Sequence, residues 1–180
     1  MLCPDFGNYR TLDLFHVELM SDIYKVLTEL GIPYARYDHP PFFTCEEADG
    51  FYSETTKGGG TCKNLFIRSR KGDRHYLVIV HSSRRVDLRH LEAVLGEKGL
   101  SLASAERLER FLGVKPGSVS PFGLVNDKNK EVVVVVERGL YTYDKLYFHP
   151  NVNTATLGIS TAGFRKFMDS TGNRVIEIEI

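Results

Sequence analysis

Five consecutive valines at positions 132–136 constrain the fold of this chain more than any other segment. Branching at Cβ favours an extended strand over a helix. An unbroken apolar run of this length has no polar face, so it predicts a strand that is buried on both faces. Such a strand requires a sheet covered by other elements, and the rest of the sequence must supply them.

Several other segments have strand or helix patterns. The apolar runs 63–68 and 75–80 flank a turn at Lys71-Gly72-Asp73, which predicts a hairpin. Further strands are predicted at 147–148, 154–159 and 175–180. Helices are predicted where a capping residue precedes an apolar period, with caps at Ser21, Asp87, Ser104 and Ser160.

Two glycine and capping patterns complete the outline. Thr44 and Glu47 have capping-box spacing, so a further helix is expected to start near Cys45. The run Gly58-Gly59-Gly60 is expected to interrupt the chain before the strand at 63–68. No GK[ST] follows these glycines, so flexibility is the favoured interpretation over a phosphate loop.

The order of elements shows no regular βαβ rhythm, which favours a mixed α/β (α+β) fold. We expect one domain at residues 21–180, with a mixed, mostly antiparallel central sheet of about six or seven strands flanked by helices. Residues 1–20 have no sustained period. They are interpreted as an N-terminal extension of uncertain role, or as the result of a start assigned upstream of Met20.

Charge and apolar patterning exclude some functions. The chain has 23 basic and 23 acidic side chains, which disfavours nonspecific coating of nucleic acid, and no DNA partner is expected. No segment has the length of a membrane span, and no secretory signal precedes the domain, so a cytoplasmic location is expected. Basic residues gather between Lys57 and Arg89, either as a solvated face or as a grip on one end of an RNA.

Three segments carry polar groups that a purely structural domain would not need. Lys63-Asn64 opens an otherwise apolar strand. Residues 116–123 contain two prolines and two glycines, which fix an unusual backbone able to present amides and carbonyls. Residues 148–156 place a histidine, two asparagines and two threonines beside predicted strand ends. Each segment alone also has a structural explanation.

Together, these motifs resemble the YbaK/ProX family, freestanding relatives of the editing domain of bacterial prolyl-tRNA synthetase. The resemblance covers about residues 21–180 and is closest to the ProX (PrdX) branch, which deacylates alanyl-tRNA-Pro. The motifs that carry it are His39-Pro40-Pro41, Thr44, Glu46-Glu47-Ala48, Lys63-Asn64-Leu65-Phe66, Gly117-x-x-x-Pro121-Phe122-Gly123-Leu124 and Phe148-His149-Pro150-Asn151-x-Asn153-Thr154-Ala155-Thr156.

The resemblance implies hydrolysis of the ester between a small, mischarged amino acid and the acceptor end of tRNA-Pro, with no metal and no organic cofactor. Prolyl-tRNA synthetase is a second candidate partner. Water attack and exclusion of proline by size are expected. The catalytic candidates are Lys63, Asn64, Gly117 and His149. The substrate-binding candidates are His39, Thr44, Ser118, Val119, Ser120, Pro121, Phe122, Asn151, Asn153 and Thr154.

Other functions stay open at this point. The substrate is alternatively Cys-tRNA-Pro or another small aminoacyl-tRNA, or the chain is a non-catalytic module that binds aminoacyl-tRNA or a synthetase. A structural or interaction protein is a further alternative. Cys62 offers a rival thiolate mechanism, although Cys62 and Lys63 point to opposite faces of a strand and cannot both line one pocket there.

Overall fold

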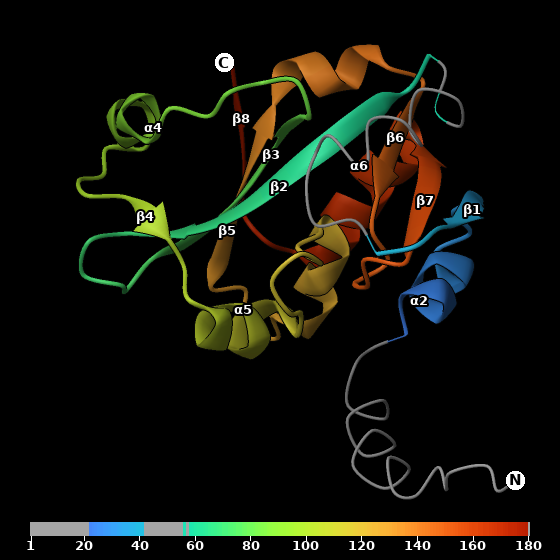
Figure 1. Cartoon of the computed structure of the whole chain (residues 1–180), viewed down its shortest axis with the longest axis horizontal. Coiled ribbons are helices and arrows are strands. Elements are labelled where there is room, and N and C mark those ends of the chain that lie inside the picture. The colour runs from blue at the N-terminus through green and yellow to red at the C-terminus, as the bar shows by residue number, and fades with distance from the viewer. Residues whose placement is uncertain (1–21, 42–55, 57, 180) are drawn as a thin grey trace, which may run out of the picture.

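A long central strand, β2 (Gly60–Arg68), organises the computed structural model, which describes residues 22–41, 56 and 58–179 (Figure 1). The sheet has the order β1-β7-β6-β2-β3-β5-β8, and β4 pairs separately with β2. The other strands are β1 (Tyr34–Asp38), β3 (His75–His81), β4 (Ser101–Leu102), β5 (Val132–Glu137), β6 (Lys145–Phe148), β7 (Ala155–Ser160) and β8 (Val175–Ile178).

The sheet is mixed, as predicted. Strand β2 pairs antiparallel with β3 and β4, and β7 pairs antiparallel with β1 and β6. The pairs β2–β6, β3–β5 and β5–β8 are parallel. In Figure 1, β6, β7 and β1 lie on one side of β2, and β3, β5 and β8 lie on the other.

The valine run forms β5, between β3 and β8. Val134 and Val136 belong to one hydrophobic cluster, and Val135 belongs to a second cluster on the opposite face. The prediction of a strand buried on both faces is therefore confirmed.

Helices cover the two faces unequally. The larger cluster packs against α2 (Ile23–Glu29), α5 (Ala105–Leu112), α6 (Thr161–Thr171) and the 3-10 helix η1 (Pro121–Asn126). The smaller cluster packs against α4 (Leu88–Leu95) and covers only the β2-β3-β5-β8 half of the sheet. A short 3-10 helix, η2 (Arg138–Thr142), follows β5. Among the described residues, no helix has the length and apolar character needed to cross a membrane.

Most predicted helix caps are confirmed, and one is wrong. Asp87 and Ser160 cap their helices by accepting from backbone N–H groups, and Ser104 occupies the N-cap of α5. The cap of α2 is Asp22 rather than Ser21, because its carboxylate reaches the N–H of Tyr24 at 3.0 Å. The helix predicted near Cys45 lies outside the described residues.

The sheet also has more strands than expected. The described residues form eight strands rather than the predicted six or seven, since β1 and β4 were not anticipated. Strand β1 contains Arg36 and Asp38 and, among the described strands, lies at the edge beside β7, where charged side chains are typical. Strand β4 has only two residues, too few for an alternating pattern.

The predicted interruption is confirmed at Gly58 and Gly59, which form a turn and a bend, but the strand begins at Gly60 rather than at residue 63. Gly60 is the first residue of β2 and pairs with Leu146. A Cβ at Gly60 would lie 2.8 Å from a ring carbon of Tyr143, so the close approach of the strands requires glycine there.

Candidate functional site

Lys63 and Asn64 point to opposite faces of β2. Lys63 pairs with Val80, whose side chain belongs to the smaller cluster, and Asn64 pairs with Ile79, which belongs to the larger one. Directly paired residues of an antiparallel ladder project to the same face. The candidate lysine and its neighbour therefore project to different sides of the sheet.

Asn64 joins the central strand to the proline-containing loop. Its side-chain N–H donates to the carbonyl oxygen of Val119 at 3.1 Å, across 55 positions of sequence. Its Oδ1 atom is buried and accepts no hydrogen bond within the described part of the chain. A buried acceptor of this kind is uncommon and is available to a ligand donor.

Side chains of the loop itself hold it against the hydrophobic core. Ser120, fully buried, caps η1 by accepting from the N–H of Phe122 at 3.2 Å, and Pro121 begins that helix. Phe122 is also fully buried and packs edge-on against Phe148 and Phe167. These three candidates hold the loop in place from the core side and do not line the cleft beside it.

A cleft of about 540 Å³ lies between this loop and the segment that follows β6. Four of the predicted substrate-binding residues line it: Ser118, Asn151, Asn153 and Thr154. Val114, Pro116 and Val152 supply apolar wall, and the lining is completed by Pro41, Glu109, Gly113 and Lys115. A largely apolar hollow with a few convergent polar groups is the usual form of a small-ligand site.

Two residues of the cleft region adopt left-handed backbone conformations. Gly117 has φ +87°, and a Cβ there would lie 3.8 Å from the side-chain nitrogen of Asn153. Asn151 has φ +63°, and its buried Oδ1 has no hydrogen-bond partner among the described residues. Non-glycine residues rarely take positive φ, and those that do gather at functional sites.

His149 is held as a neutral ring with a defined tautomer. Its Nδ1 atom lies 2.9 Å from the carbonyl oxygen of Ala155, which can only accept, so Nδ1 carries the proton. Burial lowers the pKa of His149, and the nearby ring of His39 also lowers it. The hydrogen bond to Ala155 acts in the opposite direction and raises the pKa. The Nε2 atom is therefore an acceptor at neutral pH.

A second histidine lies against the first. The His39 and His149 rings are edge-on with centroids 5.8 Å apart, and His39 Nε2 lies 3.0 Å from the hydroxyl of Thr156. Thr156 is buried. The remaining candidate, Thr44, falls outside the described residues.

Strand register and ring contacts place His149 on the same face as Lys63. Tyr147 pairs with Thr61, so Tyr147 shares a face with Lys63, two residues after Thr61. His149 follows the end of β6, and its ring lies against His39, which contacts Thr156 on the face away from the larger cluster. Phe148, between Tyr147 and His149, points the other way into the larger cluster. The candidates thus divide into two sets. Lys63, His149 and His39 share one face of the sheet, and Asn64 anchors the loop on the other.

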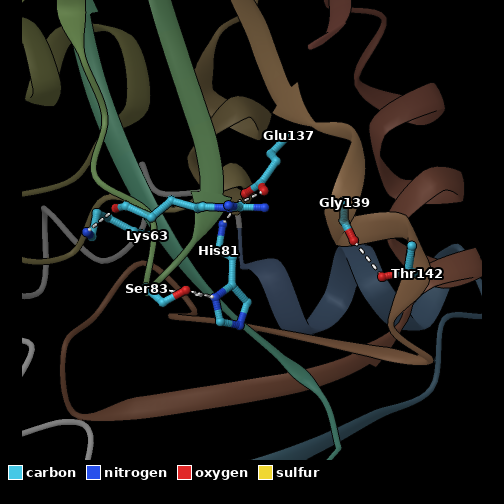
Figure 2. Close-up of polar contacts among 7 residues, drawn as sticks. Lys63, His81, Ser83, Glu137, Gly139 and Thr142 are labelled. Carbon is cyan, nitrogen blue, oxygen red and sulfur yellow. Dashed lines mark hydrogen bonds and ion pairs between the residues drawn. The ribbon is translucent and has the colours of Figure 1, made fainter. Parts of the chain in front are cut away.

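Lys63 is tied to a turn that follows β3 (Figure 2). Its ammonium group donates to the carbonyl oxygen of Arg84 at 2.9 Å. The Arg84 guanidinium in turn donates to buried Glu137 at 2.7 Å. The turn, the end of β5 and η2 border a small pocket of about 220 Å³ lined in part by His81 and Tyr143.

Cys62 is poorly suited to nucleophilic attack. Its thiol donates to the carbonyl oxygen of Gly60 at 3.5 Å and packs against the larger cluster. Burial strongly raises the pKa of the Cys62 thiol, which disfavours the thiolate that attack would need.

Sequence reasoning did not identify Glu137, Arg84 or Thr156 as site residues. Glu137 had a signal, because it is a charged residue directly after a buried apolar run. Thr156 lies in the 148–156 motif but was not chosen. Arg84 had only a compositional signal, as one of the basic residues between Lys57 and Arg89, because its contacts come from strands distant in sequence.

Comparison with known proteins gives a consistent result. Residues 39–167 match the family described as the aminoacyl-tRNA editing domain. The chain is 38% identical over 154 residues to the prolyl-tRNA editing protein ProX of Acetoanaerobium sticklandii, covering 86% of this chain and 93% of that protein. It is 33% identical over 157 residues to prolyl-tRNA synthetase associated domain-containing protein 1 of Danio rerio, covering 86% and 84%.

A solved structure described as a candidate trans-editing enzyme for prolyl tRNA synthetase shares the fold. The TM-score is 0.64 at 19% sequence identity, over 94% of this chain and 98% of the other. The predicted mixed α/β class is therefore confirmed by a known structure as well as by the strand order.

Proposed function

Because the chain belongs to the aminoacyl-tRNA editing domain family, we propose that it is a trans-acting deacylase of mischarged tRNA-Pro, with Ala-tRNA-Pro as its main substrate. Membership of the family makes the chain an aminoacyl-tRNA hydrolase. The acceptor end of tRNA-Pro is its partner, and prolyl-tRNA synthetase is the protein with which it would cooperate. Residues 21–180 form the proposed functional unit.

The observation that carries this proposal is the cleft between the 113–118 loop and the 151–154 segment. The left-handed conformations of Gly117 and Asn151 shape it, and Asn151 contributes a buried oxygen without a partner in the described part of the chain. A cleft with apolar walls and such an acceptor suits a small aminoacyl group, whose α-ammonium needs a hydrogen-bond acceptor.

An aminoacyl ester is already activated, so its hydrolysis needs a positioned water and stabilisation of the oxyanion. In the proposed mechanism, neutral His149 accepts a hydrogen bond through Nε2 from the water or the ribose hydroxyl. Lys63, on the same face, places positive charge against the terminal phosphate, the ribose or the oxyanion. The backbone groups of the Gly117–Val119 loop, which Asn64 anchors, contact the amino acid.

Selection against proline rests on size. Each methylene in a pocket changes the contact free energy by only about 1–3 kcal/mol, whereas a rigid wall excludes a larger ring by steric clash. Pro116, with its restricted φ, and Val152 line the cleft, and we assign them to such a wall, which the buried Phe122 supports from the core. A wall that excludes proline still admits alanine, serine and cysteine, and we place alanine first among them because the chain resembles the ProX branch.

The test is deacylation of Ala-, Cys-, Ser- and Pro-tRNA-Pro by the purified protein at multiple turnover. We expect Ala-tRNA-Pro to be hydrolysed fastest and Pro-tRNA-Pro to be spared. Faster hydrolysis of Cys-tRNA-Pro would overturn the choice of alanine. Binding without hydrolysis of any of the four would replace the enzyme by an aminoacyl-tRNA-binding module.

A further inference from the structure

We propose that Glu137 is a positioning residue that sets the location of the Lys63 ammonium group through the turn containing Arg84. The inference rests on the proposed function, because it assigns Lys63 a role in deacylation. It concerns a residue at the end of β5 that belongs to none of the sequence motifs of the site.

Three hydrogen bonds make up the connection (Figure 2). Glu137 Oε2 accepts from the backbone N–H of His81 at 2.8 Å, and Oε1 accepts from Nε of Arg84 at 2.7 Å. The carbonyl oxygen of Arg84 then accepts from Nζ of Lys63 at 2.9 Å. One carboxylate therefore holds the turn at its first residue, His81, and again through the side chain of Arg84.

The register of the sheet explains why a turn is needed to connect them. Lys63 pairs with Val80 on β3, and Ile79 pairs with Val136 on β5, so Glu137 lies beside Val80 on the far side of β3. Lys63 and Glu137 are thus separated by two strand spacings, or about 10 Å, too far for direct contact. Residues 81–84 fold back over the end of β3 and bridge this gap.

The burial of Glu137 indicates that its carboxylate has a specific role. Only 3% of Glu137 is exposed, and a buried carboxylate is disfavoured unless charge and hydrogen bonds compensate. Its partners are the turn N–H and one guanidinium, and Arg84 is itself half exposed. An apolar side chain would pack against the valine strand without this penalty. The hydrogen bonds that fix the 81–84 turn therefore explain why a carboxylate occupies this buried position.

The consequence for Lys63 is a restricted ammonium group. A lysine ammonium has three N–H donors, and a flexible four-carbon stem leaves it free to take many positions. The Arg84 carbonyl occupies one donor and leaves two for the substrate. Fixing the group before substrate arrives removes entropy from the catalytic step.

The test compares Glu137→Gln with Glu97→Gln as the matched control. Glu97 is also largely buried and binds an arginine of the same hairpin, Arg74, at 2.8 Å, together with the hydroxyl of Tyr76. It lies at the opposite end of β2 and β3, away from Lys63. Both substitutions remove one buried carboxylate charge, but only Glu137 contacts the 81–84 turn.

Two readouts separate positioning from stability. The first is the single-turnover rate of Ala-tRNA-Pro deacylation at saturating protein, where we expect about a tenfold loss in Glu137→Gln, because small misplacements of a catalytic group reduce rate steeply. The second is the NMR signal of ¹³Cε-labelled Lys63, assigned by its absence in Lys63→Ala. We expect this signal to shift in Glu137→Gln and to stay unchanged in Glu97→Gln.

A double variant tests whether Glu137 acts through Lys63. If Glu137 acts through Lys63, the substitution Glu137→Gln should cost less than twofold in a Lys63→Ala background, since coupled residues are not additive. A full tenfold loss in that background would overturn the proposal, as would an unchanged Lys63 signal in Glu137→Gln or an equal rate loss in Glu97→Gln.

Arg84→Met provides a second route if Glu137→Gln does not fold. It keeps the backbone carbonyl and the apolar stem and removes the guanidinium that Glu137 holds. The same shift in the Lys63 signal is expected, and an unshifted signal would contradict the proposal. The NMR arm needs no substrate, so a wild-type protein without deacylase activity would reject the proposed function while leaving this inference testable.

Discussion

The side-chain amide of Asn64 donates to the backbone carbonyl of Val119 at 3.1 Å and so attaches the central strand to the loop that walls the cleft. This single contact couples two motifs that lie 55 residues apart. It makes the loop's position depend on a side chain that packs on the opposite face of the sheet from Lys63.

Asn64→Ala should therefore reduce activity more than stability. Loss of one neutral hydrogen bond costs about 0.5–1.5 kcal/mol, whereas a displaced loop would lower kcat/KM by about tenfold or more. Asn126→Ala is the control, because its amide also donates to a backbone carbonyl, that of Leu112, at 2.8 Å. Urea unfolding and deacylation kinetics measure both effects. Equal loss of activity in the two variants would contradict a specific role for Asn64.

Gly117→Ala should disturb the cleft through the backbone. Positive φ is unfavourable for alanine by roughly 1–2 kcal/mol, although the added methyl would be in ordinary contact with Asn153. Gly31→Ala is matched in backbone strain, with φ +61° and open space around the new Cβ. We expect similar shifts of the urea midpoint and a loss of deacylation only in Gly117→Ala. An active Gly117→Ala variant would argue against backbone recognition by this loop.

His149 predicts a dependence of stability on pH. Its pKa in the folded state lies below the ordinary value of 6.5, because burial disfavours the charged ring. The unfolded chain thus binds the proton first as pH falls. The contribution of His149 is fully present above about 6.5, its unfolded pKa, and is lost progressively below it.

His149→Gln should therefore lose less stability than the wild type between pH 7.5 and pH 5. His75 contributes in the same direction, since burial also lowers its pKa, so His75→Gln is measured in parallel. Only His149→Gln should also lose deacylation at pH 7.5. Identical pH profiles for wild type and His149→Gln would show that this ring does not titrate as described.

Cys62→Ser should retain deacylation within about threefold of wild type. The half-buried thiol packs against the core and desolvation raises its pKa, so attack by a thiolate is disfavoured, and a water mechanism does not need sulfur. Iodoacetamide should also label Cys62 slowly in the folded protein. Abolished hydrolysis in a Cys62→Ser variant that unfolds cooperatively would revive the thiol mechanism.

Much of this architecture follows from local sequence. The five valines predict a strand covered on both faces, and β5 is that strand. Asp87 and Ser160 predict helix starts because a capping side chain acts within three residues. The edge strand β1 escaped prediction, since it is paired with β7, more than 110 residues later.

The candidate site divides in the same way. The sequence by itself identified Lys63, Gly117 and His149 as an ordered set and their loops as unusual backbone. Only the tertiary structure decided that Lys63 and Asn64 project to different faces of the sheet and that Phe122 supports the loop from the core. It also decided that Glu137 is connected to Lys63 through Arg84. The reason is physical: residue type and spacing set local conformation, but sheet register determines which distant side chains meet.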